Sequence, residues 1–396
     1  MKRVAVLVQS LNNGGAERMA ANLSLELARH YRVYLIVFDA ERIIYPYGGR
    51  LIDLKVPPLA EGSAARRVMN TLTRVRRLRY IKKKLGIDVT ISHMEGANLV
   101  NILSRMNDRI LCVYHSMPSM CESGSFANRL LHRFIGNGAD SYLTVSKLAE
   151  ADMHESFGVD DKKLSCIYNF CDLEKIRSWK EKELPKEAQA FYAAHPHMII
   201  SVGRLTHMKA HDRLLRMLSV LRKDDPEAGL VVLGEGEERE ALQKLADELG
   251  LASHFYLPGE VENPFPYLKR ARVFALISDF EGLPMVLIEA AACALPIVSV
   301  DIPSGPREIL APNTDQRERT KETVECSCGL LCPPCADEER RGELGEKEAM
   351  FAEALKRLLR DEELHKRLRE RSAECAQRFS AERIVSQWQE IIEQKK

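Results

Sequence analysis

The stretch VFALISDFEGLPMVLIEAAA, residues 273–292, places a strand, a loop and a helix in direct succession. Five apolar residues precede Ser278, which is typical of a strand buried on both faces of a sheet. Pro284 suits the first turn of a helix, and the apolar residues after it predict a helix over 284–292. Strand, loop and helix in this order form the repeating unit of a parallel α/β sheet.

Two carboxylates lie in this stretch, Glu281 in the loop and Glu289 about one and a half turns into the helix. Backbone N–H groups at the start of a helix favour a phosphate, and carboxylates accept hydrogen bonds from hydroxyl groups. The alternative is a capping acid and a charged residue on an amphipathic helix. Because Glu289 stands among apolar residues and needs a polar partner there, the pattern favours a binding site.

The same alternation extends through the chain in both directions. Strands are predicted at 198–202, 229–233, 254–257 and 297–300, with helices at 210–221, 237–249 and 264–270 between them. Further strands are predicted at 4–8, 33–38, 87–92, 110–114 and 141–144, and the first helix at 16–28. The fold class is therefore α/β, with two doubly wound Rossmann-like domains and a ligand cleft expected between them.

A chain of 396 residues exceeds one ordinary hydrophobic core, which also indicates two domains. We expect the first domain over 1–172 and the second over 197–377. The stretch 173–196 is polar, contains two prolines and is expected to be a helix-poor linker. Residues 378–396 are expected to form a last helix that returns to the first domain, because Ile384, Trp388 and Ile392 form one apolar stripe.

Cations and glycines follow the first strand of each domain. Gly203, Arg204 and Lys209 come after strand 198–202, where a guanidinium and an ammonium could hold a diphosphate and stabilise it as a leaving group. Gly14 and Gly15, within the segment 12–18, would let the backbone approach a ligand at a helix N-terminus. The alternatives are two solvated charges and a flexible turn, and the three-glycine dinucleotide fingerprint is missing.

Over residues 1–335 the chain resembles the bacterial glycosyltransferases of family 4, which have the two-domain GT-B fold. The resemblance rests on Gly-Gly-Ala-Glu-Arg from Gly14, Gly-Arg-Leu…Lys from Gly203, residues 233–236, Glu281 with Glu289, and residues 296–298 and 304–309. It implies a retaining enzyme that transfers a hexose or N-acetylhexosamine from a nucleotide sugar, UDP-linked by preference, to a lipid-linked or polysaccharide acceptor.

The resemblance also implies residue roles. Arg204 and Lys209 would bind the donor diphosphate, Glu289 the ribose and Glu281 the transferred sugar. His115 would be a catalytic histidine of the cleft, although without the resemblance it reads as a surface loop residue. The remaining donor-binding residues are Gly14, Gly15, Gly203, Gly282, Leu283, Pro284 and Met285. No cofactor or metal is expected, because the cleft motifs offer no Asp-x-Asp pair for a divalent ion.

Two other functions remain open. A nucleotide-sugar epimerase shares this fold and would consume the donor without an acceptor. A non-catalytic nucleotide- or sugar-binding protein is the second alternative, and the intact set Arg204, Lys209, Glu281 and Glu289 argues against it.

Four of the ten cysteines crowd together as Cys326, Cys328, Cys332 and Cys335. The spacing could bind zinc, but its loops are tighter than those of usual structural sites. Free thiols in a reducing compartment are the preferred interpretation, and the zinc question stays open.

Net charge is +1, so no overall field draws the protein to nucleic acid. A basic run without acids nevertheless lies between Glu61 and Asp88, and it predicts a helix on an anionic membrane surface rather than a solvated face. The candidate membrane or acceptor residues are Arg74, Arg76, Arg77, Arg79, Lys82 and Lys83. No apolar run reaches the ~18 residues of a membrane span, and the first apolar run is too short for a signal peptide. The expected location is cytoplasmic, peripheral on the inner face of the plasma membrane.

Overall fold

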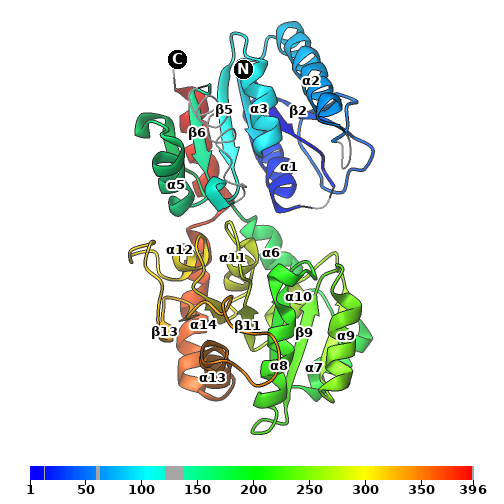
Figure 1. The fold of residues 1–396 in the computed structure, drawn as a ribbon, viewed down its shortest axis with the longest axis vertical. Helices are drawn as coiled ribbons and strands as arrows, with labels where there is room; N and C mark the ends of the chain where they lie inside the picture. The colour runs from blue at the N-terminus through cyan, green and yellow to red at the C-terminus, as the bar shows by residue number, and fades with distance from the viewer. Residues whose placement is uncertain (13, 59–62, 121–137, 395–396) are drawn as a thin grey trace. The chain divides into compact units, whose positions relative to one another are not determined.

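A computed structural model describes residues 1–12, 14–58, 63–120 and 138–394. The chain divides into two compact units, Met1–Phe170 with Ala381–Lys396, and Cys171–Ser380. Each unit is a seven-stranded sheet covered by helices, so the predicted α/β class with two Rossmann-like domains is confirmed (Figure 1). Among the described residues, no helix combines the length and apolar character that a membrane crossing requires.

The sheet of the first unit has the order β3-β2-β1-β4-β5-β6-β7, and every neighbouring pair is parallel. The strand order reverses direction between β1 and β4, which is the switch point where such sheets bind ligands. Its strands are β1 (Arg3–Val8), β2 (Arg32–Val37), β3 (Arg50–Asp53), β4 (Val89–His93), β5 (Arg109–Tyr114), β6 (Ser141–Thr144) and β7 (Leu164–Cys166). Its helices include α1 (Gly15–Leu27), α2 (Ala64–Leu85), α3 (Glu95–Leu103), α5 (Lys147–Phe157) and α15 (Ala381–Glu393).

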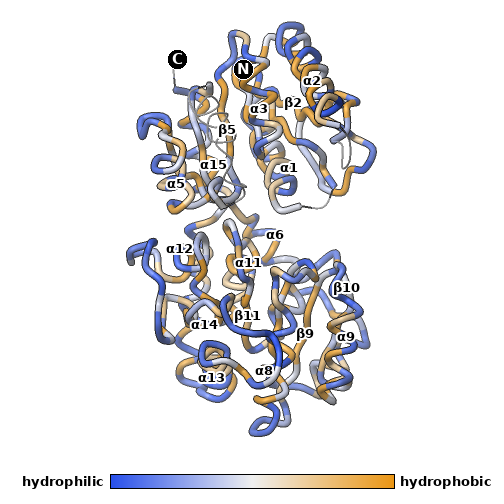
Figure 2. The backbone as a smooth tube through the Cα atoms, in the orientation of Figure 1, coloured by the Kyte–Doolittle hydropathy of each residue, from blue (hydrophilic) through white to orange (hydrophobic). Residues whose placement is uncertain are grey.

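The sheet of the second unit has the order β10-β9-β8-β11-β12-β14-β13, parallel except for β13. The strands are β8 (His197–Val202), β9 (Ala228–Leu233), β10 (Phe255–Gly259), β11 (Val273–Leu276), β12 (Ile297–Val300), β13 (Val324–Glu325) and β14 (Gly329–Cys332). The helices include α8 (His211–Leu221), α9 (Arg239–Glu248), α10 (Phe265–Arg270), α11 (Met285–Ala292), α12 (Pro306–Leu310), α13 (Glu346–Arg360) and α14 (Glu362–Gln377). In both units the hydrophobic residues follow the strands and the inner helix faces (Figure 2).

The stretch 173–196, expected to be helix-poor, carries two helices and groups with the second unit. They are α6 (Leu173–Trp179) and α7 (Lys186–Ala194). The Asp172 side chain caps α6 by accepting a hydrogen bond from the Lys175 N–H at 2.9 Å. Each helix buries a single side chain, Ile176 or Ala188, so the sequence contains no apolar stripe that would have revealed them.

The last helix, α15, belongs to the first unit and buries Ile384, Trp388 and Ile392. Two cations, one in β5 and one just before β1, secure its C-terminal end. Arg109 donates to the backbone oxygens of Ile391 at 2.6 Å and Gln394 at 2.7 Å, and Lys2 donates to that of Ile392 at 2.8 Å. Cations at a helix C-terminus satisfy carbonyls that have no partner within the helix.

The cations of α2 divide into buried, packed and exposed ones. Lys82 is buried, with its Nζ 2.8 Å from Asp108 Oδ2 and 2.8 Å from Asn101 Oδ1. Burial lowers the pKa of Lys82, and the Asp108 carboxylate opposes that shift. The prediction that Lys82 faces a membrane is therefore wrong. The charge pattern of the basic run did not reveal that Lys82 is paired with Asp108.

Arg74 and Arg77 also turn toward the protein. Arg74 donates to the backbone oxygens of Val56 at 3.0 Å and Pro57 at 2.7 Å, and it lies over the Phe38 ring. Arg77 donates to the Leu54 carbonyl oxygen. Both therefore hold α2 against the segment that follows β3.

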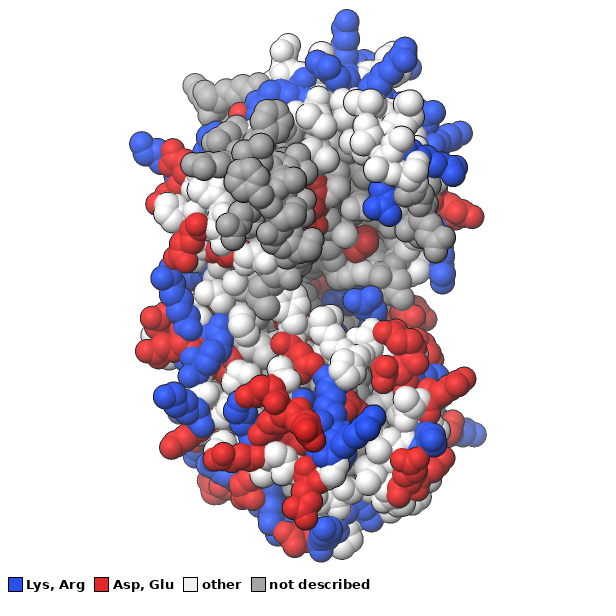
Figure 3. Space-filling model, viewed as in Figure 1, with Lys and Arg blue, Asp and Glu red and all other residues white. Residues whose placement is uncertain are grey.

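Part of the exposed surface of α2 is mixed apolar and basic, and is here called the outer face. Its apolar members are 57% to 64% exposed, and its cations follow one or two turns later on the same side of the helix. Figure 3 shows Lys and Arg gathered over α2. The outer face comprises Val68, Met69, Leu72, Arg76, Arg79, Tyr80 and Lys83.

We expect Lys82→Met to destabilise the first unit by about 3–5 kcal/mol, because it leaves the Asp108 carboxylate buried without its counter-charge. Urea unfolding followed by circular dichroism measures the loss. The neighbouring Lys83→Met is the matched control, since Lys83 is exposed and its loss is expected to cost no more than about 0.5 kcal/mol. Equal stability of the two variants would contradict the role given to the Lys82–Asp108 pair.

Candidate functional site

Three loops meet at the carboxyl edge of the second sheet. The Gly203 N–H donates to the Leu233 oxygen at 3.0 Å, and the Leu205 N–H donates to the Glu235 oxygen at 2.8 Å. The Asp279 N–H donates to the Met208 oxygen at 2.9 Å. The loops after β8, β9 and β11 are thus bonded to one another through their backbones, at the edge where ligands bind in such sheets.

Glycines allow this close approach. A Cβ on Gly234 would lie 1.9 Å from the Gly203 oxygen, so any side chain there would push the loops after β8 and β9 apart. Gly305, with φ +96°, packs against the start of α11, and a Cβ there would lie 2.2 Å from Pro284 Cδ. The neighbouring Ser304 hydroxyl donates to the Gly282 oxygen at 2.7 Å. The residues Ser304 and Gly305 therefore hold the loop that carries Glu281 in place.

Lys209 and Glu281, predicted separately from two motifs, form an ion pair. Lys209 ends the short 3-10 helix η3 (His207–Lys209), and its Nζ lies 2.5 Å from Glu281 Oε1. Their side chains are 16% and 11% exposed, so little water screens the pair. Each group thereby satisfies the charge of the other.

Arg340 joins the same loops and was not predicted. Its guanidinium forms an ion pair with Asp279, lies 3.3 Å from Asp212 Oδ1, and donates to the His207 carbonyl oxygen at 2.7 Å. Arg340 lies in a charged segment far along the chain, where no motif distinguishes it from its neighbour Arg341. Only the folded chain brings it to the site.

The other donor-binding residues predicted in the second unit lie close to Lys209 or Glu281 in sequence, or at the same carboxyl edge of the sheet. Arg204 directly follows the β8 end and is exposed, so its guanidinium is accessible to a ligand. Leu283 and Met285 are buried, and Pro284 is the N-cap of α11, which has no side-chain capping bond. Glu289, on α11, is 6% exposed. Their roles in binding stay predictions.

The first unit places its candidates at the carboxyl edge of its own sheet. Gly14 is the N-cap of α1, and its N–H donates to the Tyr45 hydroxyl at 3.2 Å. A Cβ on Gly15 would meet nothing within 4 Å among the described residues, so no neighbour in that part of the chain requires a glycine there. Asn13, part of the same motif, lies outside the described residues.

His115 directly follows β5 and pairs with a histidine that the sequence did not single out. His93 Nδ1 and His115 Nε2 lie 2.9 Å apart, with the rings stacked at a centroid distance of 5.2 Å. Burial lowers the pKa of His115 to about 4 and, with the nearby His115, that of His93 well below its usual value. Both rings are therefore neutral at pH 7. As the last residue of a buried strand, His93 had no motif to mark it.

The four clustered cysteines do not gather into a metal-ligand set in the described part of the chain. Cys332 Sγ contacts the Thr323 hydroxyl at 3.6 Å, Cys335 Sγ contacts the Pro333 oxygen at 3.5 Å, and Cys328 interacts with Cys375. Burial raises the pKa of Cys326 to about 11. The geometry favours protonated thiols and gives the zinc interpretation no support.

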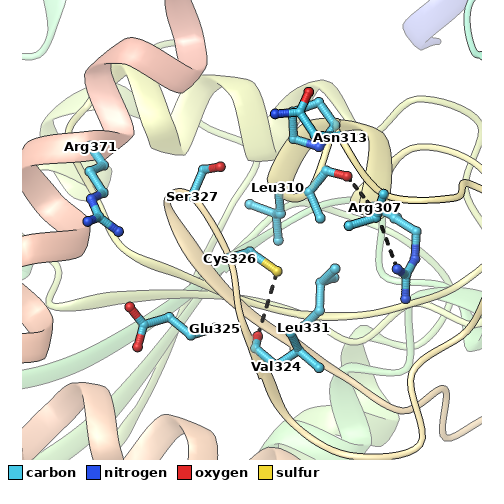
Figure 4. A pocket seen from close by; sticks show the side chains of 12 residues that line it. Arg307, Leu310, Asn313, Val324, Glu325, Cys326, Ser327, Leu331 and Arg371 are labelled. Atoms are coloured by element: carbon cyan, nitrogen blue, oxygen red, sulfur yellow. Dashed lines mark hydrogen bonds between the residues drawn. The ribbon is translucent and has the colours of Figure 1, made fainter.

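A cavity of about 420 Å³ lies elsewhere in the second unit, between α12, β13 and β14 (Figure 4). Arg307, Cys326 and Arg371 are among its lining residues, and none of the predicted donor-binding residues is. Arg307 is already bound to the buried Asp301 carboxylate. The cavity therefore adds nothing to the loops around Lys209 and Glu281.

Comparison with family models matches both units. Residues 13–175 match the model described as Glycosyltransferase Family 4, and residues 186–374 match the model described as Glycosyl transferases group 1. Together these ranges contain every donor-site residue that the sequence predicted.

Two relatives from Campylobacter jejuni are similar over nearly the whole chain. One is the N-acetylgalactosamine-N,N'-diacetylbacillosaminyl-diphospho-undecaprenol 4-alpha-N-acetylgalactosaminyltransferase, 28% identical, covering 97% of this chain and 98% of its own length. The other is an alpha-1,4-N-acetyl-D-galactosaminyltransferase named for a PP-undecaprenol glycan, 24% identical, covering 99% and 98%. Among solved structures, HepE from Anabaena in complex with UDP superimposes with a TM-score of 0.75 at 17% identity, covering 99% of each chain, which shows a shared fold.

Because Arg340 holds the loops after β8 and β11 together, Arg340→Gln is expected to loosen both. Amide hydrogen exchange at Asp279 should accelerate about tenfold or more, the scale of one lost charge-assisted hydrogen bond. Arg341→Gln removes an exposed charge from the next position and should leave that exchange rate unchanged. Slow exchange at Asp279 in both variants would show that Arg340 does not support the site.

Proposed function

Since the chain belongs to the family 4 glycosyltransferases with the GT-B fold, we propose that it transfers a hexose or N-acetylhexosamine from a UDP-sugar to a lipid-linked glycan. We propose further that the transfer retains anomeric configuration and needs no metal ion. The observation that carries the proposal is the Lys209–Glu281 pair at the carboxyl edge of the second sheet. It combines a phosphate-binding cation with a hydroxyl-binding carboxylate at one place.

Donor binding would exchange partners within this pair. Lys209 leaves Glu281 for an oxygen of the diphosphate, and Glu281 accepts hydrogen bonds from hydroxyls of the sugar instead. Arg204, exposed in the loop after β8, would supply a second cation. As the bond between sugar and phosphate breaks, negative charge grows on the diphosphate, and the two cations stabilise that leaving group.

The start of α11 supports the same ligand. The N–H groups of Met285 and Val286 precede the intrahelical bonds of α11, and the helix has no side-chain cap, so they are suited to donate hydrogen bonds to a phosphate oxygen. Gly282, Leu283, Pro284 and Met285 would line the phosphates through this backbone. Glu289, one turn further, would accept hydrogen bonds from the ribose hydroxyls.

The proposed reaction needs no carboxylate nucleophile. The acceptor hydroxyl oxygen bonds to the anomeric carbon, the bond from that carbon to the phosphate oxygen breaks, and the acceptor proton passes to the departing phosphate. Glu281 is held beside Lys209 as a binding group, so it is not assigned the nucleophile role that retaining glycosidases give to a carboxylate.

The acceptor and the location rest on the relatives and on α2. Both Campylobacter relatives are named for undecaprenol-linked acceptors and for transfer of N-acetylgalactosamine. The outer face of α2 offers exposed apolar side chains beside cations, a combination that suits the interface of an anionic membrane. We propose a cytoplasmic protein that docks on the inner membrane face through this helix.

A donor-panel assay tests the function. UDP-, GDP- and ADP-sugars are supplied with and without bacterial membrane lipid extract, in the presence of EDTA, and nucleotide release is measured. We expect release from a UDP-sugar only when the extract is present. Conversion of the donor without nucleotide release, with or without the extract, would favour an epimerase, and binding without turnover a non-catalytic protein. Activity lost in EDTA and restored by magnesium or manganese would contradict the metal-free mechanism.

We expect Glu281→Gln to bind UDP about fivefold more tightly than the wild type, because Lys209 no longer has to be freed from an ion pair worth about 1 kcal/mol. Turnover should fall at the same time, since the carboxylate that holds the sugar is lost. Calorimetry and the donor assay measure the two effects. Lys209→Met, which removes the other partner, should instead weaken UDP binding by about tenfold or more. Weaker binding by Glu281→Gln would contradict the partner exchange.

Docking through α2 predicts salt-sensitive binding to phosphatidylglycerol vesicles in co-sedimentation. Changing Arg76, Arg79 and Lys83 together to Gln should weaken this binding about a hundredfold, since each cation near an anionic surface contributes about 1 kcal/mol. Lys82 is left intact because its loss is expected to destabilise the first unit.

The matched control removes three exposed lysines of the second unit, Lys186, Lys223 and Lys244, and changes the net charge equally. It should bind vesicles like the wild type. Equal loss in both triple variants, or equal binding to neutral phosphatidylcholine vesicles, would overturn the assignment of the outer face.

A further inference from the structure

The hydrogen bond between His93 and His115 contains one proton, and its position decides what His115 can do. His93 ends β4 and is 2% exposed, whereas His115 follows the neighbouring β5. With 2.9 Å between His93 Nδ1 and His115 Nε2, one ring must donate and the other accept. Two arrangements of neutral rings are therefore possible. They differ in which of the two outer ring nitrogens, His93 Nε2 or His115 Nδ1, carries a proton.

The far nitrogen of His93 separates the two arrangements. His93 Nε2 is buried and has no hydrogen-bond partner within the described part of the chain. If His93 accepted the bond at Nδ1, its proton would sit on Nε2 as a buried N–H without an acceptor, a state that native proteins rarely contain. If His93 donates from Nδ1, Nε2 is a buried ring nitrogen without a proton, which proteins tolerate better than a buried N–H without an acceptor.

We infer that His93 donates its Nδ1–H to His115 Nε2 and thereby holds His115 in the tautomer that carries its proton on Nδ1. His93 is then a positioning residue. His115 presents an N–H donor and has no free basic nitrogen, so it serves as a hydrogen-bond donor toward an oxygen of the transferred sugar. This last step rests on the proposed function.

The backbone around His93 is built to hold this geometry. Met94, the next residue, has φ +76°, a conformation that non-glycine residues rarely adopt and that concentrates at functional sites. It is held there because the Met94 N–H donates to the Val113 oxygen at 3.2 Å, and the buried Asn98 amide donates to the same oxygen at 3.0 Å. Val113 stands opposite His93 in the β4–β5 ladder, so these bonds fix both ring-bearing strand ends.

Nitrogen NMR of ¹⁵N-histidine-labelled protein tests the inference directly, because the two neutral tautomers give distinct ring-nitrogen shifts. In the free wild-type protein at pH 7, His115 should be the Nδ1–H tautomer and its Nε2 should accept the bond. A His115 signal of the Nε2–H tautomer, or of an imidazolium, would overturn the inference without any variant.

Two substitutions extend the test to turnover. In His93→Asn the amide can donate from nearly the same place as Nδ1–H, so the His115 tautomer and most of the turnover should be kept. His93→Phe cannot donate, and it should release His115 to a tautomer mixture and lower turnover at least about tenfold, with UDP affinity unchanged. An unchanged tautomer in His93→Phe would contradict the role of His93. If the tautomer changes but turnover does not, the pairing of His93 with His115 stands, and the contact proposed between His115 and the donor is refuted.

Discussion

Two opposite charges with little access to water must stay paired, and at the site of the second unit these charges belong to Lys209 and Glu281. They lie on loops after different strands, so their attraction holds the loops together, and glycines at 234 and 305 let the backbones come close enough. A ligand that separates the pair must satisfy both groups. A nucleoside diphosphate sugar can satisfy both, because its phosphates bind an ammonium and its hydroxyls bind a carboxylate.

In the first unit, a buried ion pair is likewise kept satisfied, here as part of a longer network of hydrogen bonds. Lys82 on α2 is bound to Asp108 and Asn101, Asn101 donates to the Ser92 hydroxyl at 3.0 Å, and Ser92 donates to Asn98 at 2.8 Å. Asn98 in turn donates to the Val113 oxygen beside His93. The inner side of α2 is thus connected, bond by bond, to the strand ends that carry the paired histidines. Its outer face contributes nothing to this network and is the surface that we propose docks on a membrane.

The sequence predicted most strands and the helices around the site well, because buried parallel strands are continuous apolar runs and their ends coincide with the motifs. It missed α6 and α7, which each bury one residue, and the short strands β3, β7 and β13. It assigned Lys82, Arg74 and Arg77 to a membrane face because charge alone does not reveal a partner such as Asp108, and it did not find His93 or Arg340 because their partners are distant in sequence. Lys209 and Glu281 were each predicted from a motif, but their contact across 72 positions was not.

A crystal structure of the protein with UDP tests the central claim most directly. We predict that in this complex the Lys209–Glu281 ion pair is broken. Lys209 Nζ should lie within about 3 Å of a phosphate oxygen, and the ribose should lie beside Glu289. UDP bound away from these loops, with the Lys209–Glu281 pair still closed, would contradict it.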